Sequence, residues 1–205
     1  RDASEIYRAA NGAGDPQYRQ SRFDLAGALA RLAAHQASRG ELEAARDSRA
    51  EVLQIHKEVL DENDYRMIDA RLALKLAESM VPMTHQQRAR IGEANKLYAT
   101  SVGLKEEGDT KGAAEQLLKA LEIRNELLGA DNPETRTMHE ALGTVYQSAN
   151  ELEKAELHYR HVVRVREELL GIRHPEYRGS VHAMASLDMS RNDYDTAIGL
   201  HRELV

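Results

Sequence analysis

The sequence predicts an all-α protein built as a solenoid of helical hairpins, and three observations carry this prediction. Ala, Leu, Glu and Arg dominate, with only 13 Gly and 4 Pro among 205 residues, a composition typical of closely packed helices. Apolar side chains recur at helical spacing. A set of turn residues and small residues returns at a constant interval, which indicates a repeat architecture.

The repeat interval is 42 residues. The segment LLGADNPE, which begins at Leu127, returns at Leu169 as LLGIRHPE. The same step joins three further sets of positions: the turn residues Gly108, Asn150 and Asn192, the alanines Ala113, Ala155 and Ala197, and the small residues Ser101, Gly143 and Ala185. An earlier unit carries Ala33, Gly40 and Ala45, but it lies 68 residues before its counterpart, so about 26 residues are inserted after it.

Each position in the repeat has a physical reason. Gly and Asn enter the left-handed region at the least cost, so a helix ends there and the chain turns. An acidic residue follows each turn, at the start of the second helix, where the helix dipole favours negative charge: Glu41, Asp109, Glu151 and Asp193. The small residues let the two helix axes approach closely. Pro133 and Pro175 open the next first helix, where a missing N–H has no cost.

These positions predict six segments. They are an N-terminal segment 1–17, a first helical repeat 18–61, an inserted helix and linker 62–84, a second clear repeat 85–131, a third repeat 132–173, and a truncated fourth repeat 174–205. Residues 64–81 should form the inserted helix, and residues 84–107 form either one long helix or two that break near Gly92. Because residue 205 precedes the next expected Leu-Leu-Gly motif, we expect apolar surface at that end.

Charge and composition exclude several classes of function. A formal net charge of −6 argues against nucleic-acid binding, which needs a basic face, and against anionic membrane surfaces. The absence of cysteine excludes disulfides and thiolate metal sites. No apolar run approaches the length of a membrane span. We therefore expect no nucleic-acid partner, no membrane partner and a cytoplasmic location.

The motifs of catalysis are absent from the sequence. No serine lies in a nucleophile elbow, and the stretch from Asn11 to Pro16 lacks the lysine of a phosphate-binding loop. His158 and His161 have a spacing that suits two metal ligands on a helix, but the pattern supplies no third ligand. The sequence therefore predicts neither an enzyme nor a metal or cofactor site.

The segments Ala120–Thr135 and Val162–Tyr177 resemble the 42-residue tetratricopeptide repeats of kinesin light chains. The resemblance implies a right-handed superhelical solenoid that binds proteins. Such repeats also occur in bacterial proteins fused to caspase-like (CHAT) proteases, nucleotide-switch ATPases or kinases, and Lys57–Arg66 with Asp69–Leu74 resembles the N-terminal part of such bacterial multidomain proteins. Where kinesin light chains hold an asparagine that clamps peptide backbone, this chain has Arg31, Ala99, Ala141 and Ala183.

In that family the first helices line the concave face, and counting from the small residue of each repeat gives candidate partner-binding positions. They are Asn95, Tyr98, Val102, Lys105, Thr137, Glu140, Thr144, Gln147, His182, Ser186 and Met189. This mixture of small polar, charged and apolar groups suits an extended peptide or a helix. Tyr98 could equally pack against the next repeat, and Lys105 and Glu140 fit solvated surface charges better than ligand contacts.

Three hypotheses of function follow from the sequence. The first is a scaffold that binds a protein, a peptide or another domain of its own polypeptide on the concave face. The second is the regulatory or sensor arm of a larger enzyme, such as a CHAT protease or a kinase, whose catalytic domain lies outside these residues. The third is a self-assembly module, with homo-oligomers formed through the C-terminal repeat.

Overall fold

The computed structural model describes residues 14–203, without the side chains of His201 and Glu203. The predicted N-terminal segment 1–17 therefore lies mostly outside the described residues. All regular secondary structure within residues 14–203 is helical, as the sequence predicted. The chain divides into two compact units, with unit 1 ending at Met83 and unit 2 starting at Thr84.

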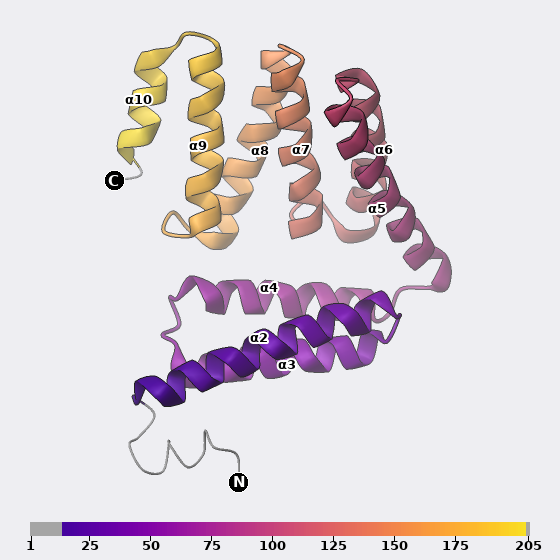
Figure 1. Cartoon of the computed structure of the whole chain (residues 1–205), viewed down its shortest axis with the longest axis vertical. Helices are drawn as coiled ribbons and strands as arrows, with labels where there is room; N and C mark the ends of the chain where they lie inside the picture. Colours follow the sequence, from indigo (N-terminus) through magenta and orange to yellow (C-terminus); the bar gives the residue numbers. More distant parts are fainter. Residues whose placement is uncertain (1–13, 204–205) are drawn as a thin grey trace. The chain divides into compact units, whose positions relative to one another are not determined.

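Within residues 14–83, unit 1 contains three helices, α2 (Pro16–Ser38), α3 (Leu42–Val59) and α4 (Tyr65–Met80), shown in Figure 1. The carboxylate of Asp15 caps α2 by accepting hydrogen bonds from the backbone of the first turn. Both α2 and α4 pack against α3, and Val52 and Ile55 of α3 are buried between them. A helix, α4, is present in the range 64–81 where the sequence predicted one, and its assignment as an insertion between repeats stays a prediction.

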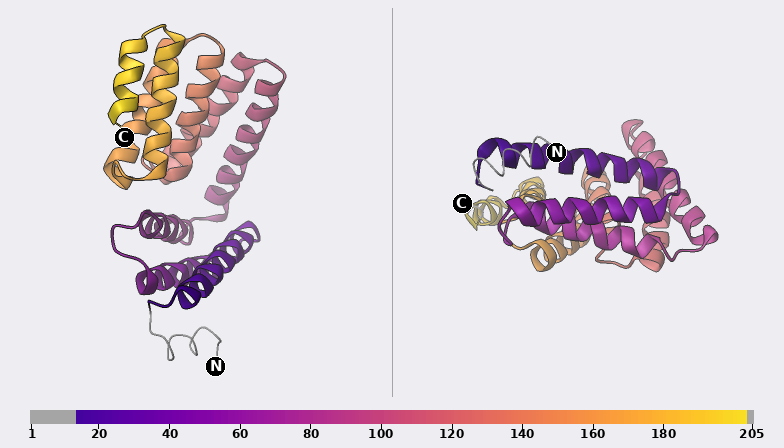
Figure 2. Two further views of the ribbon diagram at one scale, coloured as in Figure 1. Left: turned by 60° about the vertical axis from the view of Figure 1, so that its left-hand side comes forward. Right: turned by 90° about the horizontal axis from the view of Figure 1, so that it is seen from below.

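Unit 2 contains α5 (His85–Glu106), α6 (Thr110–Leu128), α7 (Pro133–Ser148), α8 (Leu152–Leu170), α9 (Pro175–Ser190) and α10 (Tyr194–Glu203). Each packs mainly against its neighbours in sequence, and successive helices run in opposite directions (Figure 2). The helix starts at Thr110 and Leu152 are 42 residues apart, as are those at Pro133 and Pro175. Gly92 does not interrupt α5, so residues 85–106 form one long helix.

The turns inside the hairpins have the backbone conformation that their residues favour. The φ angle is +86° at Gly108, +58° at Asn150 and +61° at Asn192, all in the left-handed region. The acidic residue after each turn is the N-cap of the second helix. Asp109 and Asp193 cap through their side chains, whereas the longer side chain of Glu151 makes no capping bond and pairs with Lys154 instead.

The small residues are buried in the contacts between paired helices. Ser101, Gly143 and Ala185 are buried on the first helices, and Ala113, Ala155 and Ala197 are buried on the second helices. A Cβ at Gly143 would lie 2.5 Å from the ring of Tyr159. The predicted role of these positions in helix packing is therefore confirmed.

The last helix leaves apolar side chains uncovered. Tyr194 is 55% exposed and Ile198 is 48% exposed on α10, so the apolar surface expected at that end is present. None of the described helices has the length and apolar character needed to cross a membrane.

Candidate functional site

Unit 2 contains a groove of about 390 Å³ between α5, α6 and α7, which we call the α5–α7 groove. It is lined by residues of all three helices: Tyr98, Ser101, Val102, Lys105, Glu106, Leu117, Thr137, Glu140, Ala141, Thr144 and Val145. The two first helices supply ten of these residues because α5 and α7 lie side by side in consecutive repeats.

The base of the groove is apolar or small, whereas its edges are polar. Leu117 and Val145 are buried below the opening, and Ser101 turns its hydroxyl back to the carbonyl of Tyr98. Val102, 41% exposed, presents its side chain at the opening. Lys105 is exposed and makes no ion pair within residues 14–203. An apolar group bound there would be removed from water and would contact apolar side chains. It would not displace strong polar interactions.

Six of the eleven predicted binding residues line this groove, and five do not. Those in it are Tyr98, Val102, Lys105, Thr137, Glu140 and Thr144. Asn95 instead accepts a hydrogen bond from buried Arg124, and Gln147 donates to the hydroxyl groups of Ser186 and Ser190. His182, Ser186 and Met189 lie on exposed positions of α9. The predicted residues therefore lie on α5, α7 and α9, and their role in binding a partner stays a prediction.

The threonine hydroxyl groups in the groove are already engaged in hydrogen bonds. Thr137 donates to the carbonyl of Pro133, and Thr144 donates to the carbonyl of Glu140, each at 3.0 Å. The single phenol hydrogen of Tyr159 lies within reach of two acceptors, Thr144 Oγ1 at 3.3 Å and Gln147 Oε1 at 3.1 Å, and burial raises the pKa of Tyr159. These bonds fix the wall of the groove rather than offer free donors to a ligand.

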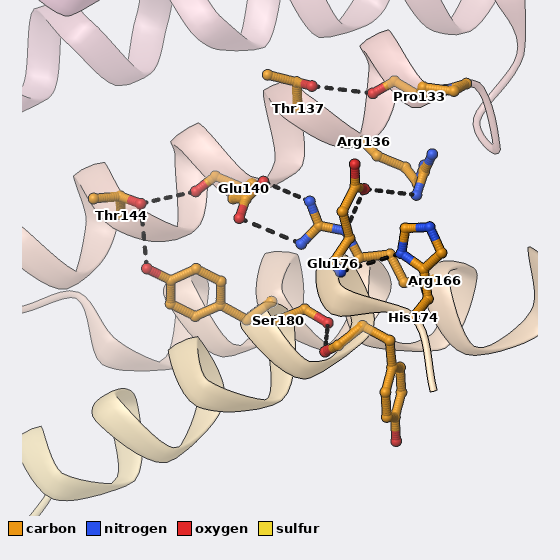
Figure 3. A network of polar contacts seen from close by, with 11 residues as sticks. Pro133, Arg136, Thr137, Glu140, Thr144, Arg166, His174, Glu176 and Ser180 are labelled. Carbon is orange, nitrogen blue, oxygen red and sulfur yellow. Dashed lines mark hydrogen bonds and ion pairs between the residues drawn. The ribbon is translucent and has the colours of Figure 1, made fainter. Parts of the chain in front are cut away.

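A buried arginine holds Glu140 in place. Arg166, 9% exposed, donates from both terminal nitrogens to the Glu140 carboxylate at 3.3 and 2.9 Å (Figure 3). Its Nε lies 3.3 Å from the carboxylate of Glu176 on α9, so one guanidinium joins three helices. Glu140 is therefore a positioned charge and not the freely solvated side chain that the sequence favoured.

The neighbouring repeat has the equivalent arrangement. Arg124, 42 residues before Arg166, is also buried; it donates to Asn95 at 2.6 Å and to the carbonyl of Glu134 at 2.7 Å. The sequence showed both arginines at one repeat position but gave no reason for them. Their burial supplies the reason. A guanidinium that is buried in a helix interface needs fixed hydrogen-bond acceptors, and here each buried arginine joins consecutive repeats.

A third histidine joins the two that the sequence singled out. Nδ1 of His139 on α7 lies 2.9 Å from Nδ1 of His158, and its ring stacks on that of His161 with centroids 4.0 Å apart. Stacked imidazoles direct their in-plane lone pairs side by side, so they do not converge on one metal ion. Within residues 14–203 no group of three His, Cys, Asp or Glu is placed to hold a metal.

Comparison with protein families agrees with the repeat found in the sequence. Residues 102–168 match the family model described as tetratricopeptide repeat. The matched segment begins in α5, includes α6 and α7 and ends in α8, so it contains the α7 wall of the groove. The predicted resemblance to tetratricopeptide repeats is confirmed. No curated protein sequence matches the chain.

Solved structures resemble this chain in fold. A Podosopora anserina protein named for kinesin light chain, with nearly identical TPR-like repeats, is 16% identical with a TM-score of 0.51, and the match covers 86% of this chain and 92% of that one. BtubC (BKLC) from P. vanneervenii is also 16% identical, with a TM-score of 0.54 and coverage of 100% and 73%. These matches confirm the helical solenoid as the fold class.

Proposed function

We propose that unit 2 is a protein-interaction module that binds an extended peptide segment in the α5–α7 groove. Tetratricopeptide repeats generally mediate contacts between proteins, which supports binding rather than catalysis as the activity of this chain. The single observation that carries the proposal is the groove itself: a concave site with an apolar base, formed by two neighbouring first helices.

The chemistry of the groove indicates the kind of segment that fits. The apolar base, formed by Leu117 and Val145, suits one aliphatic or aromatic side chain. Lys105 at the edge would attract a carboxylate next to that side chain, whereas Glu140, held by Arg166, would repel one. Glu106, which also lines the groove beside Lys105, reduces this attraction, so the segment that we propose is defined by its apolar residue.

The segment could come from a separate protein or from another domain of the same polypeptide. We further propose that the module acts in the cytoplasm, since a chain without cysteine needs no oxidising compartment. The source of the segment and the cellular location do not affect the geometry of binding. The experiment on the groove tests neither of them.

The experiment selects peptides from a random displayed library with the whole chain and then measures their affinity by fluorescence polarisation. Val102→Lys places a charge in the groove, while Leu118→Lys places the same charge on an aliphatic residue of α6 outside the groove lining. The two side chains are 41% and 43% exposed, so they form a matched pair. Val102→Lys should weaken binding by about tenfold or more, which is about 1.4 kcal/mol.

Leu118→Lys should leave the affinity within about twofold, because it changes net charge without touching the site. Circular dichroism should show equal helical content in both variants. Equal loss of affinity in the two variants, or no loss in Val102→Lys, would show that peptides bind elsewhere.

A further inference from the structure

Three imidazole rings meet between α7 and α8, on a different side of α7 from the groove. His139 projects from α7, and His158 and His161 project from consecutive turns of α8. The ring centroid of His139 lies 5.1 Å from that of His158 and 4.0 Å from that of His161. Tyr146 of α7 stacks on His158 at 5.6 Å, so the rings form part of the packed interface. We call His139, His158 and His161 the histidine cluster.

The contacts within the histidine cluster disfavour the addition of protons to its rings. The Nδ1 atoms of His139 and His158 are 2.9 Å apart, so one carries a proton and the other accepts it. If both rings became imidazolium ions, two N–H groups would face each other and the contact would break. A charge on His161 would lie directly against the His139 ring, stacked at 4.0 Å.

His161 has a further reason to stay neutral. Its Nε2 is buried without a hydrogen-bond partner among the described residues, although a hydrogen bond to the backbone of Ala130 favours the charged ring. Protonation would place an N–H on that buried nitrogen with no acceptor, which costs the desolvation energy of a charged donor.

The charges around the cluster do not offset this cost. Arg164 on α8 disfavours charge on His161, while Asp131 before α7 and Glu168 on α8 favour it more weakly. Lys154 of α8 lies over the outer ring, Tyr146, at 5.2 Å. Within the described residues, no charged group of α6 or α9 acts on the three rings. Burial, with the two neighbouring rings, lowers the pKa of His139 to about 4, and burial also lowers the pKa of His158 and His161.

We propose that the histidine cluster is an acid-sensitive latch, which holds α7 against α8 while its rings are neutral and releases them when the rings take up protons. Because α7 also carries Ala141, Thr144 and Val145 of the α5–α7 groove, release of α7 deforms that groove. The opening of the latch is independent of the proposed function. Its consequence, the loss of a bound peptide in acid, rests on that function.

The direction of the effect follows from the pKa of His139. The open state titrates near 6.5 and the closed state near 4, so the open state binds more protons between these values. The closed state is fully favoured above about pH 6.5 and loses stability as the pH falls towards 4. For His139 alone, these two pKa values predict a roughly twentyfold rise in the opening equilibrium constant from pH 7 to pH 5, with partial exposure of the ring reducing it to nearer tenfold.

The test is hydrogen exchange of the whole chain by mass spectrometry at pH 7 and pH 5, corrected for intrinsic exchange rates. Peptides from α7 and α8 should show the rise in opening, while those from α2 and α3 should not. His139→Gln should lose most of the rise. His85→Gln, which removes an exposed histidine from α5, should retain it. An undiminished rise in His139→Gln would overturn the proposal.

A second measurement uses the unaltered chain, in case His139→Gln does not fold. Titration of the imidazole resonances by NMR should find at least one histidine with a midpoint well below 5; nine midpoints near 6.5 would also overturn the latch. Both experiments omit the peptide, so failure of the proposed function leaves them interpretable. If a peptide does bind at pH 7, its loss at pH 5 should be smaller in His139→Gln, and an equal loss would overturn the link to the groove.

Discussion

Replacing Gly143 by alanine should destabilise unit 2, although alanine is the better helix former. The added Cβ would lie 2.5, 2.7 and 2.9 Å from three ring carbons of Tyr159, well inside van der Waals contact. Tyr159 is 4% exposed, and its hydroxyl is bonded to Thr144 and Gln147, so the ring cannot swing away without losing those bonds. The helices α7 and α8 would have to separate.

The magnitude follows from two opposing effects. Overpacking a tight interface typically costs about 1–3 kcal/mol, and here the contact is with a buried, anchored ring, at the upper part of that range. The change from glycine to alanine inside a helix returns about 1 kcal/mol. The net loss in the free energy of unfolding should therefore be about 1–2 kcal/mol.

Urea denaturation followed by circular dichroism at 222 nm measures this difference. Gly179→Ala is the matched control, because Gly179 lies in α9 and an added Cβ there meets nothing within 4 Å. It should stabilise the protein by about 0.5–1 kcal/mol. In a Tyr159→Leu background the cost of Gly143→Ala should shrink, which gives a measurable coupling energy. If Gly143→Ala stabilised the chain as much as Gly179→Ala does, the close-approach argument would be refuted.

Two further predictions concern the ends of helices. Asn150→Ala should lower the free energy of unfolding by about 1 kcal/mol, whereas Asn150→Gly should leave it nearly unchanged, because φ is +58° there; equal midpoints in urea for the two variants would contradict this. Thr84→Ala should lower the free energy of unfolding by about 1 kcal/mol and speed amide exchange in the first turn of α5. The reason is that the Thr84 hydroxyl and the Gln87 side chain each accept a hydrogen bond from the other residue's backbone N–H. Thr84→Ser should behave as the unaltered chain.

The positions that the sequence identified best are those whose role depends on residues close by in the chain. Asn150 and Asn192 adopt the left-handed backbone that their turn position predicted. Gly143 and Ala155 are buried at a helix contact, as small residues 12 apart on the two arms of a hairpin should be. The fold class could therefore be predicted from residue types and the 42-residue repeat interval.

The contacts that the candidate residues make within the chain could not be predicted from the sequence, and the reason is shared. Gln147, which is predicted to face a partner, bonds Tyr159, Ser186 and Ser190. Glu140 fits a surface charge in the sequence, yet Arg166 holds it. His139 carries no signal in the repeat pattern and still meets His158 across the interface. Each of these contacts joins residues from 12 to 43 positions apart.

The sequence by itself determined the helical hairpins, their 42-residue interval and the turn and small residues that shape them, because backbone preference and side-chain size act within a few residues of the chain. The tertiary structure alone decided which residues of α5, α6 and α7 enclose the groove, that Arg166 joins three helices, and that three histidines share one interface. These features depend on how each helix is rotated about its axis and which rotamers meet across an interface. Those quantities are fixed by the packing of distant segments and not by local sequence.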